Sequence, residues 1–135
     1  MLLIYVTGDT HGRHDIGKLS EEAFPEQKNL TRDDKVIITG DFGLVFSGTE
    51  AEQMYLDWLQ DRNFTTLFVD GNHENFDMLN RYDIEDWNGG KVHFIRPNVI
   101  HLMRGYVFNI DNKKIFTFGG ASSIDKAHRI EGISW

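Results

Sequence analysis

Three short blocks of polar and glycine residues each come directly after an apolar run in this sequence of 135 residues. They are Gly8-Asp9-Thr10-His11-Gly12, Gly40-Asp41-Phe42-Gly43 and Gly71-Asn72-His73-Glu74. Carboxylate, imidazole and amide groups bind divalent transition metals, and histidine is the side chain that most often acts as a general acid or base. Because open α/β folds build their sites at the carboxyl ends of strands, the blocks predict a metal-dependent active site.

The spacing within the blocks suggests how the ligands divide between two ions. Asp9 and His11 are two residues apart, so a curled loop can bring their carboxylate and imidazole to one ion. Asp41 follows the next strand, and a carboxylate there can bridge two ions about 3.5–4 Å apart. Asn72 offers an amide oxygen to the second ion, so that His73 beside it can face the substrate. We expect two divalent transition-metal ions, with manganese or iron favoured over magnesium and zinc also compatible.

Each block also has a simpler interpretation as a turn. Glycine–aspartate pairs are common in turns, and a single aspartate after a strand is more often a helix cap than a ligand. Turn chemistry does not explain why two of the blocks also contain histidine. Nor does it explain why all five side chains fall at one edge of the predicted sheet. The combination favours a functional site more strongly than any single motif does.

The composition excludes several other classes of protein. Acidic residues outnumber basic residues by 21 to 14, giving a formal charge of −7, which repels a nucleic-acid backbone. We therefore expect no general nucleic-acid binding. There is no cysteine, so disulfides, thiolate metal sites and thiol catalysis are excluded. Any metal in this chain must be bound by oxygen and imidazole ligands.

The elements that position the blocks alternate between strand and helix patterns. Apolar runs predict strands over residues 2–7, 35–39 and 65–69. Helical spacing is present from Ile16 through Leu19 to Ala23, ending before Pro25, and again over residues 50–62, with a short helix expected over 75–81. Right-handed crossovers make the three strands parallel and neighbouring.

The second half of the chain has the pattern of an antiparallel or mixed sheet. Short strands are predicted over residues 92–95, 99–103, 106–110 and 114–118, separated by turn signals such as Asp111-Asn112. We expect one α/β domain over residues 1–135. The N-terminal apolar run is too short for a signal peptide or a membrane span, so we expect a cytoplasmic location and no membrane association.

The three blocks resemble the first three signature motifs of the calcineurin-like metallophosphoesterases, over about residues 3–74. The resemblance implies that Asp9 and His11 bind the first metal, Asp41 bridges, Asn72 binds the second metal, and His73 assists catalysis. It also implies a double β-sandwich flanked by helices. The implied activity is hydrolysis of a phosphomonoester or phosphodiester by a metal-activated hydroxide, with the motif histidine protonating the leaving group.

Two features depart from the pattern of that family. Asp41 is followed by Phe42 and Gly43 instead of the Asp-Arg-Gly of protein phosphatases, which favours a general phosphomonoesterase or phosphodiesterase. The later histidine motifs are also missing. We therefore expect a fold truncated at its C-terminus, whose exposed sheet edge invites self-association. The later histidines, which lack the motif context, are expected to be structural or surface residues: His93, His101 and His128.

Two other functions fit parts of the sequence. A noncatalytic interaction module, or an inactive fragment, can share the fold but is expected to lose its catalytic groups first, and His73 is present. A nucleotide-binding α/β domain lacks its Walker or Gly-x-Gly-x-x-Gly pattern. Arg13 can grip a phosphate or be a solvated surface residue. Three aromatic residues can stack a nucleobase or belong to the core: Phe42, Phe46 and Phe76.

Overall fold

The computed structural model describes residues 2–120, 127 and 129–133. His128 lies outside the described residues, so the expectation for it stays a prediction. Among the described residues, no helix has both the length and the apolar character needed to cross a bilayer.

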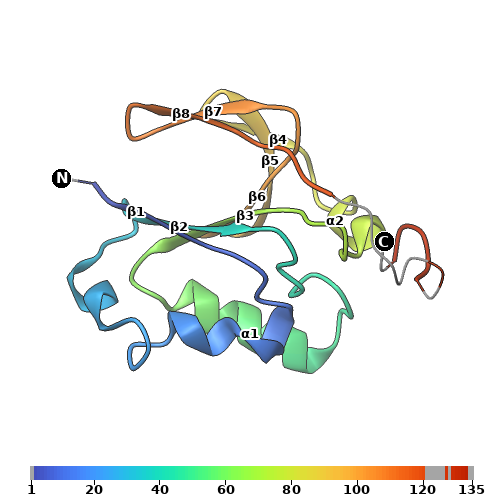
Figure 1. Ribbon diagram of the computed structural model, residues 1–135, viewed down its shortest axis with the longest axis horizontal. Coiled ribbons are helices and arrows are strands. Elements are labelled where there is room, and N and C mark those ends of the chain that lie inside the picture. Colours follow the sequence, from blue (N-terminus) through green and yellow to red (C-terminus); the bar gives the residue numbers. More distant parts are fainter. Residues whose placement is uncertain (1, 121–126, 128, 134–135) are drawn as a thin grey trace.

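A mixed sheet of six strands forms the centre of the fold (Figure 1). Its strands, in spatial order, are β1 (Ile4–Thr7), β2 (Lys35–Thr39), β3 (Thr65–Val69), β6 (Val99–Leu102), β5 (Gly90–Arg96) and β4 (Glu85–Trp87). The four strands β1, β2, β3 and β6 are parallel to one another, whereas β5 is antiparallel to both of its neighbours, β6 and β4. The prediction of three neighbouring parallel strands is confirmed. Their carboxyl ends consequently lie along one edge of the sheet.

Different layers cover the two faces of this sheet. Helix α1 (Glu50–Gln60) packs on one face, and the antiparallel hairpin of β7 (Val107–Ile110) and β8 (Lys113–Phe116) lies over the other (Figure 1). Successive side chains of a strand point to opposite faces of the sheet, so both faces of β2 are buried. Ile38 belongs to the core beneath the helix, and Ile37 belongs to the core beneath the hairpin. The predicted turn at Asp111-Asn112 joins the hairpin strands, with φ of 51° and 65°.

The N-terminus of α1 also holds the loop that follows β2. Thr49 caps the helix by accepting a hydrogen bond from the Glu52 backbone N–H at 3.3 Å. The Glu52 carboxylate reaches back and accepts from the backbone N–H groups of Phe46, Ser47 and Gly48 at 2.7, 2.9 and 2.8 Å. This arrangement resembles a capping box and fixes the segment between the second block and the helix.

The largest differences from the sequence prediction lie in three segments, and several other elements differ by one or two residues at their ends. The helix expected from Ile16 to Ala23 is replaced by short 3₁₀ helices: η1 (Gly12–His14), η2 (Ile16–Leu19) and η3 (Pro25–Asn29). Pro25 begins η3, where its missing N–H costs nothing, instead of only ending a helix. The helix predicted over 75–81 is the single turn α2 (Phe76–Leu79). Strand β4 was not predicted at all.

Candidate metal centre

Backbone hydrogen bonds join the loop after β1 to the loop after β2. The N–H of His11 donates to the carbonyl of Asp41, and the N–H of Gly12 donates to the carbonyl of Phe42, both at 2.8 Å. The hydroxyl of Thr10, which is fully buried, donates to the same Phe42 carbonyl at 2.9 Å. The first two blocks therefore form one unit, in which the position of each side chain depends on both strands.

Gly43 allows these two loops to approach so closely. A Cβ atom at this position would lie 2.4 Å from the backbone nitrogen of Gly12 and 2.8 Å from the carbonyl carbon of His11. Its φ of +76° also lies in the left-handed region that favours glycine. No larger residue fits without moving the loop that carries His11.

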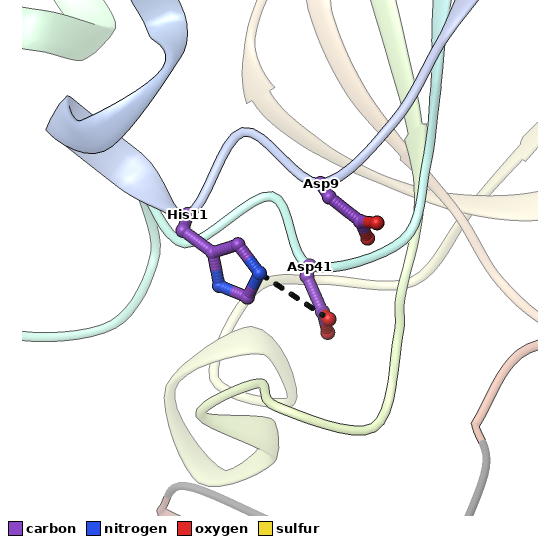
Figure 2. A group of neighbouring side chains, drawn as sticks. All are labelled: Asp9, His11 and Asp41. Atoms are coloured by element: carbon purple, nitrogen blue, oxygen red, sulfur yellow. Dashed lines mark ion pairs between the residues drawn. The ribbon is translucent and has the colours of Figure 1, made fainter.

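Asp9, His11 and Asp41 come together at this edge of the sheet (Figure 2). One potential ligand atom from each lies within 4.8 Å of the other two, and Nε2 of His11 is 3.6 Å from Oδ2 of Asp41. All three residues have left-handed backbones, with φ of 52°, 46° and 49°. Two carboxylates and an imidazole converging on one point form a donor set that fits a divalent transition metal.

The third block supplies the rest of the predicted site. Asn72 lines a hollow of about 370 Å³ together with Asp9, Asp41 and Asp70, and we call this hollow the acidic pocket. The backbone N–H of His73 donates to Oδ1 of Asp41 at 3.0 Å. Asn72 and the backbone of His73 thus lie beside the cluster of Asp9, His11 and Asp41, and the roles of all five residues toward a metal or a substrate stay predictions.

Glu74 ties the second block to the third, a role that sequence reasoning missed. Its Oε1 accepts from the backbone N–H groups of Phe42 at 2.9 Å and Gly71 at 3.3 Å, and the residue is 1% exposed. Burial, helped by the nearby charges of Asp41 and Asp70, raises the pKa of Glu74 to about 7, although the two backbone donors act in the opposite direction. The only sign of this role in the sequence was that Glu74 is an acidic residue of the third block to which no metal-binding role had been given.

A buried polar network lies beside the third block. Oδ1 of Asp70 is 2.8 Å from Nε2 of His101, and its Oδ2 accepts from Nε of Arg104 at 2.6 Å. Nδ1 of His101 is in turn 2.9 Å from Nδ1 of His93. Both ring nitrogens of His101 are engaged within the protein, which supports the structural role predicted for these histidines.

The network also sets the charge state of its members. Burial opposes ionisation of Asp70, but hydrogen bonds and charges from His101 and Arg104 outweigh it and lower the pKa of this carboxyl below its ordinary value. Burial and the neighbouring His101 lower the pKa of His93. Asp70 is therefore an anion held in place immediately before the third block.

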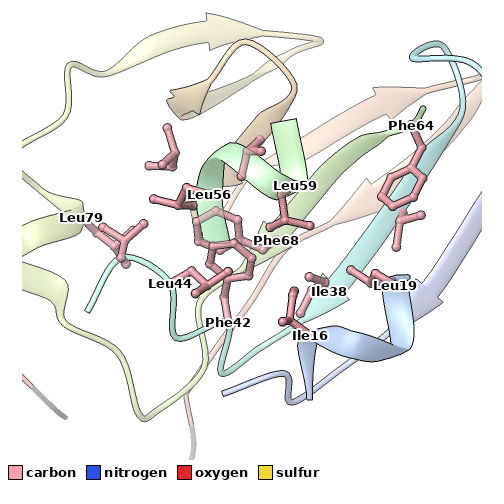
Figure 3. Packing of buried hydrophobic residues seen from close by; sticks show 14 of the residues in the cluster. Ile16, Leu19, Ile38, Phe42, Leu44, Leu56, Leu59, Phe64, Phe68 and Leu79 are labelled. Atoms are coloured by element: carbon pink, nitrogen blue, oxygen red, sulfur yellow. The ribbon is translucent and has the colours of Figure 1, made fainter. Parts of the chain in front are cut away.

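The aromatic residues near the blocks have different roles. Phe42 is fully buried and stacks on Phe68 with ring centroids 4.0 Å apart, within the core that Figure 3 shows. Phe76 lies beneath the guanidinium of Arg104, which is 5.3 Å from its ring centroid. Phe46 lines a pocket beside the site. Of the three, Phe42 is thus a core residue that cannot stack a ligand.

Comparison with known proteins identifies the family. A sequence model described as calcineurin-like phosphoesterase matches residues 2–134. The chain belongs to this family, as the three motifs predicted, and its mixed α/β fold is consistent with the calcineurin-like type. Membership indicates metal-dependent hydrolysis of phosphate esters as the general class of activity. Comparisons with curated proteins and with solved structures found no match.

Proposed function

We propose that this chain is a metal-dependent phosphoesterase that hydrolyses a phosphomonoester or a phosphodiester. The convergence of Asp9, His11 and Asp41 within 4.8 Å, in a chain of this family, carries the proposal. Left-handed backbones at all three residues cost stability, and such strain is concentrated at functional sites.

Two divalent transition-metal ions, manganese or iron, fit the donor groups of the site. Asp9 and His11 would hold one ion, Asn72 would hold the other, and Asp41 would serve both. Ions held there would act as Lewis acids on the phosphoryl oxygens and lower the pKa of a bound water toward about 7. The fixed loops would hold the substrate's phosphorus next to these ligands without further rearrangement.

We assign His73 as the proton donor to the leaving group. Its backbone is fixed by the hydrogen bond to Asp41, and its side chain lines a pocket that His11 also lines. In the reaction, the oxygen of water bonds to phosphorus and the bond to the leaving oxygen breaks, with its electron pair passing to that oxygen. His73 gives the leaving oxygen a proton and regains one from the attacking water.

Hydrolysis of two aryl phosphates tests this assignment. We expect Mn²⁺ to restore turnover of phenyl phosphate and p-nitrophenyl phosphate in chelator-treated protein. His73→Asn should lower kcat by about 10²- to 10⁴-fold. The loss should be larger for phenyl phosphate, because its poorer leaving group depends more on protonation.

Three controls complete this experiment. Calorimetry should show that His73→Asn still binds Mn²⁺, which separates loss of the acid from loss of the metal. Turnover of bis(p-nitrophenyl) phosphate distinguishes a diesterase from a monoesterase. Absence of Mn²⁺-dependent turnover of all three esters would contradict the proposal and favour a noncatalytic module on the same fold.

A further inference from the structure

Two pockets of opposite charge flank the pair formed by His11 and Asp41. The acidic pocket lies on the side of Asp41. The other, which we call the basic pocket, has a volume of about 440 Å³. Its cationic or imidazole side chains are His11, Arg13, His14, His73 and Arg129. In a chain with a formal charge of −7, this grouping separates a site for cations from a site for anions.

Two basic side chains of the pocket, Arg13 and His14, have no acidic partner among the described residues. In the described part of the chain, the side chains of Arg13 and His14 are exposed and form neither a hydrogen bond nor an ion pair. Glu52 is the one acidic residue among the described lining residues. Its carboxylate is already occupied by the backbone N–H groups of Phe46, Ser47 and Gly48. Arg13 and His14 are therefore available to contact an anion in the pocket.

The basic pocket is continuous with the predicted metal centre. His11 lines it while placing Nε2 3.6 Å from Oδ2 of Asp41, which lines the acidic pocket. His73 also lines it and is held by Oδ1 of the same carboxylate. If His73 protonates the leaving oxygen, the leaving group must lie in the basic pocket. This step rests on the proposed function.

We propose that the basic pocket binds a second phosphate group carried by the leaving group. The substrate class would then be phosphate esters or anhydrides in which another phosphate lies close to the scissile one. Arg13 can form paired, charge-assisted hydrogen bonds to such a phosphate. The pocket volume lies within the range of small-molecule sites, and Phe46 and Tyr55 provide walls for the organic part of the ligand.

Binding of inorganic pyrophosphate tests the pocket without any metal or turnover. We would titrate pyrophosphate, and inorganic phosphate for comparison, into chelator-treated protein by calorimetry at one fixed ionic strength, because salt screens exposed charges. Arg13→Gln should weaken pyrophosphate binding about tenfold or more, through loss of charge-assisted hydrogen bonds. His14→Gln should also weaken pyrophosphate binding.

Arg81→Gln is the matched control for Arg13→Gln. Arg81 is also exposed, lies outside the pocket lining, and loses the same charge on substitution. We expect this variant to bind pyrophosphate within about twofold of the wild type, since its charge lies outside the pocket lining and is screened by salt. Undetectable binding to the wild type, or equal losses for Arg13→Gln and Arg81→Gln, would overturn the proposal.

A second measurement separates this inference from the proposed function. With Mn²⁺ present, kcat/KM for adenosine diphosphate should fall at least about tenfold more than kcat/KM for phenyl phosphate when Arg13 becomes Gln. Equal losses for both substrates would overturn the inference and leave the phosphoesterase activity in place. Arg13-dependent pyrophosphate binding without any Mn²⁺-dependent turnover would support the pocket and contradict the proposed function.

Discussion

Asp9, His11 and Asp41 hold backbone conformations that ordinary residues seldom adopt. Each left-handed residue costs about 1–3 kcal/mol, so the surrounding structure must compensate. The hydrogen bonds between the first two loops provide that compensation, and Gly43 makes them possible by allowing close approach. The side chains are consequently arranged before any ion arrives, which lowers the cost of binding one.

The contact at Gly43 leads to a prediction for a single added methyl group. Gly43→Ala should lower the free energy of unfolding by at least about 3 kcal/mol, from a left-handed alanine and from overlap with Gly12 and His11. It should also weaken Mn²⁺ binding. Gly105 is a matched control, because its φ is +87° but a Cβ atom there meets nothing within 4 Å.

Chemical denaturation and Mn²⁺ calorimetry of both alanine variants measure these effects. Gly105→Ala should cost about 1–2 kcal/mol, for the backbone alone, and should leave Mn²⁺ binding as in the wild type. Equal losses of stability and of Mn²⁺ affinity in the two variants would show that the close approach of the loops is unimportant.

Glu74 gives a second prediction at the scale of one residue. Glu74→Ala leaves the N–H groups of Phe42 and Gly71 without their acceptor and should destabilise the metal-free protein by about 2–5 kcal/mol. Glu74→Gln keeps an accepting oxygen and avoids burying a charge, so it should stay within about 1 kcal/mol of the wild type. Denaturant unfolding of both variants decides this, and a glutamine variant as unstable as the alanine variant would refute it.

The sequence predicted which residues gather at the site better than it predicted what supports them. Asp9, His11 and Asp41 were found because their types and their position after strands express ligand chemistry directly. The roles of Glu74 and Asp70 depend on burial and on partners about thirty residues away, which local patterns do not encode.

At the scale of elements, a line of hydrogen bonds crosses three strands. Asp70 follows β3, His101 lies in β6 and His93 lies in β5, so the network joins the parallel part of the sheet to its antiparallel part. His93 is 1% exposed, and burial and the neighbouring His101 disfavour its protonated form more than the charge of Asp70 favours it. The fold therefore keeps this imidazole neutral.

The lowered pKa of His93 predicts how stability depends on pH. Below its ordinary value of 6.5, the unfolded chain binds a proton at His93 that the folded chain does not bind. The contribution of His93 to the stability of the metal-free protein should therefore fall as pH falls from about 7 to about 5, by at most about 1.4 kcal/mol per pH unit. The raised pKa of Glu74 acts in the opposite direction over the same range, so the His93 contribution is read from the difference between wild type and variant. In urea unfolding, His93→Gln should lose less stability than the wild type, or gain more, as pH falls from about 7 to about 5.

The stability measured below about pH 4 provides the internal control for that experiment. Asp34 and Asp70 have lowered pKa values, so their contributions are present above about pH 4 and are lost as pH falls further. The wild type and His93→Gln should lose stability alike there. An unchanged slope between pH 7 and 5 in the variant would contradict the role given to His93.

Elements with a clear apolar pattern in the sequence were predicted well, and elements without such a pattern were not. The runs that became β2 and β3 matched their predicted bounds, because they are apolar and bounded by polar blocks. Strand β4 has two exposed residues and no apolar run, and it forms because β5 pairs with it. Over the segment predicted as a helix from Ile16 to Ala23, the backbone N–H groups of Lys18 and Ser20 donate to the carbonyls three residues earlier, so the segment forms 3₁₀ turns.

At the scale of the whole molecule, the layers explain how distant segments form one site. The parallel arrangement of β1, β2 and β3 brings three loops to one edge, with the helix and the hairpin covering the two faces. Both pockets open at this edge, one with acidic and one with basic side chains. The fold thus brings a pocket lined by acidic side chains and a pocket lined by basic side chains to the residues of the predicted metal centre.

Calorimetric titration of Mn²⁺ into chelator-stripped protein tests the central claim most directly, because it counts sites before any substrate is chosen. We predict two sites in the wild type and at least about 100-fold weaker binding in Asp41→Asn, which loses the shared carboxylate. Asp33→Asn, an exposed aspartate away from the cluster, should bind as the wild type does. A wild-type chain that binds no Mn²⁺, or an Asp41→Asn variant that binds it equally well, would contradict a metal centre at these residues.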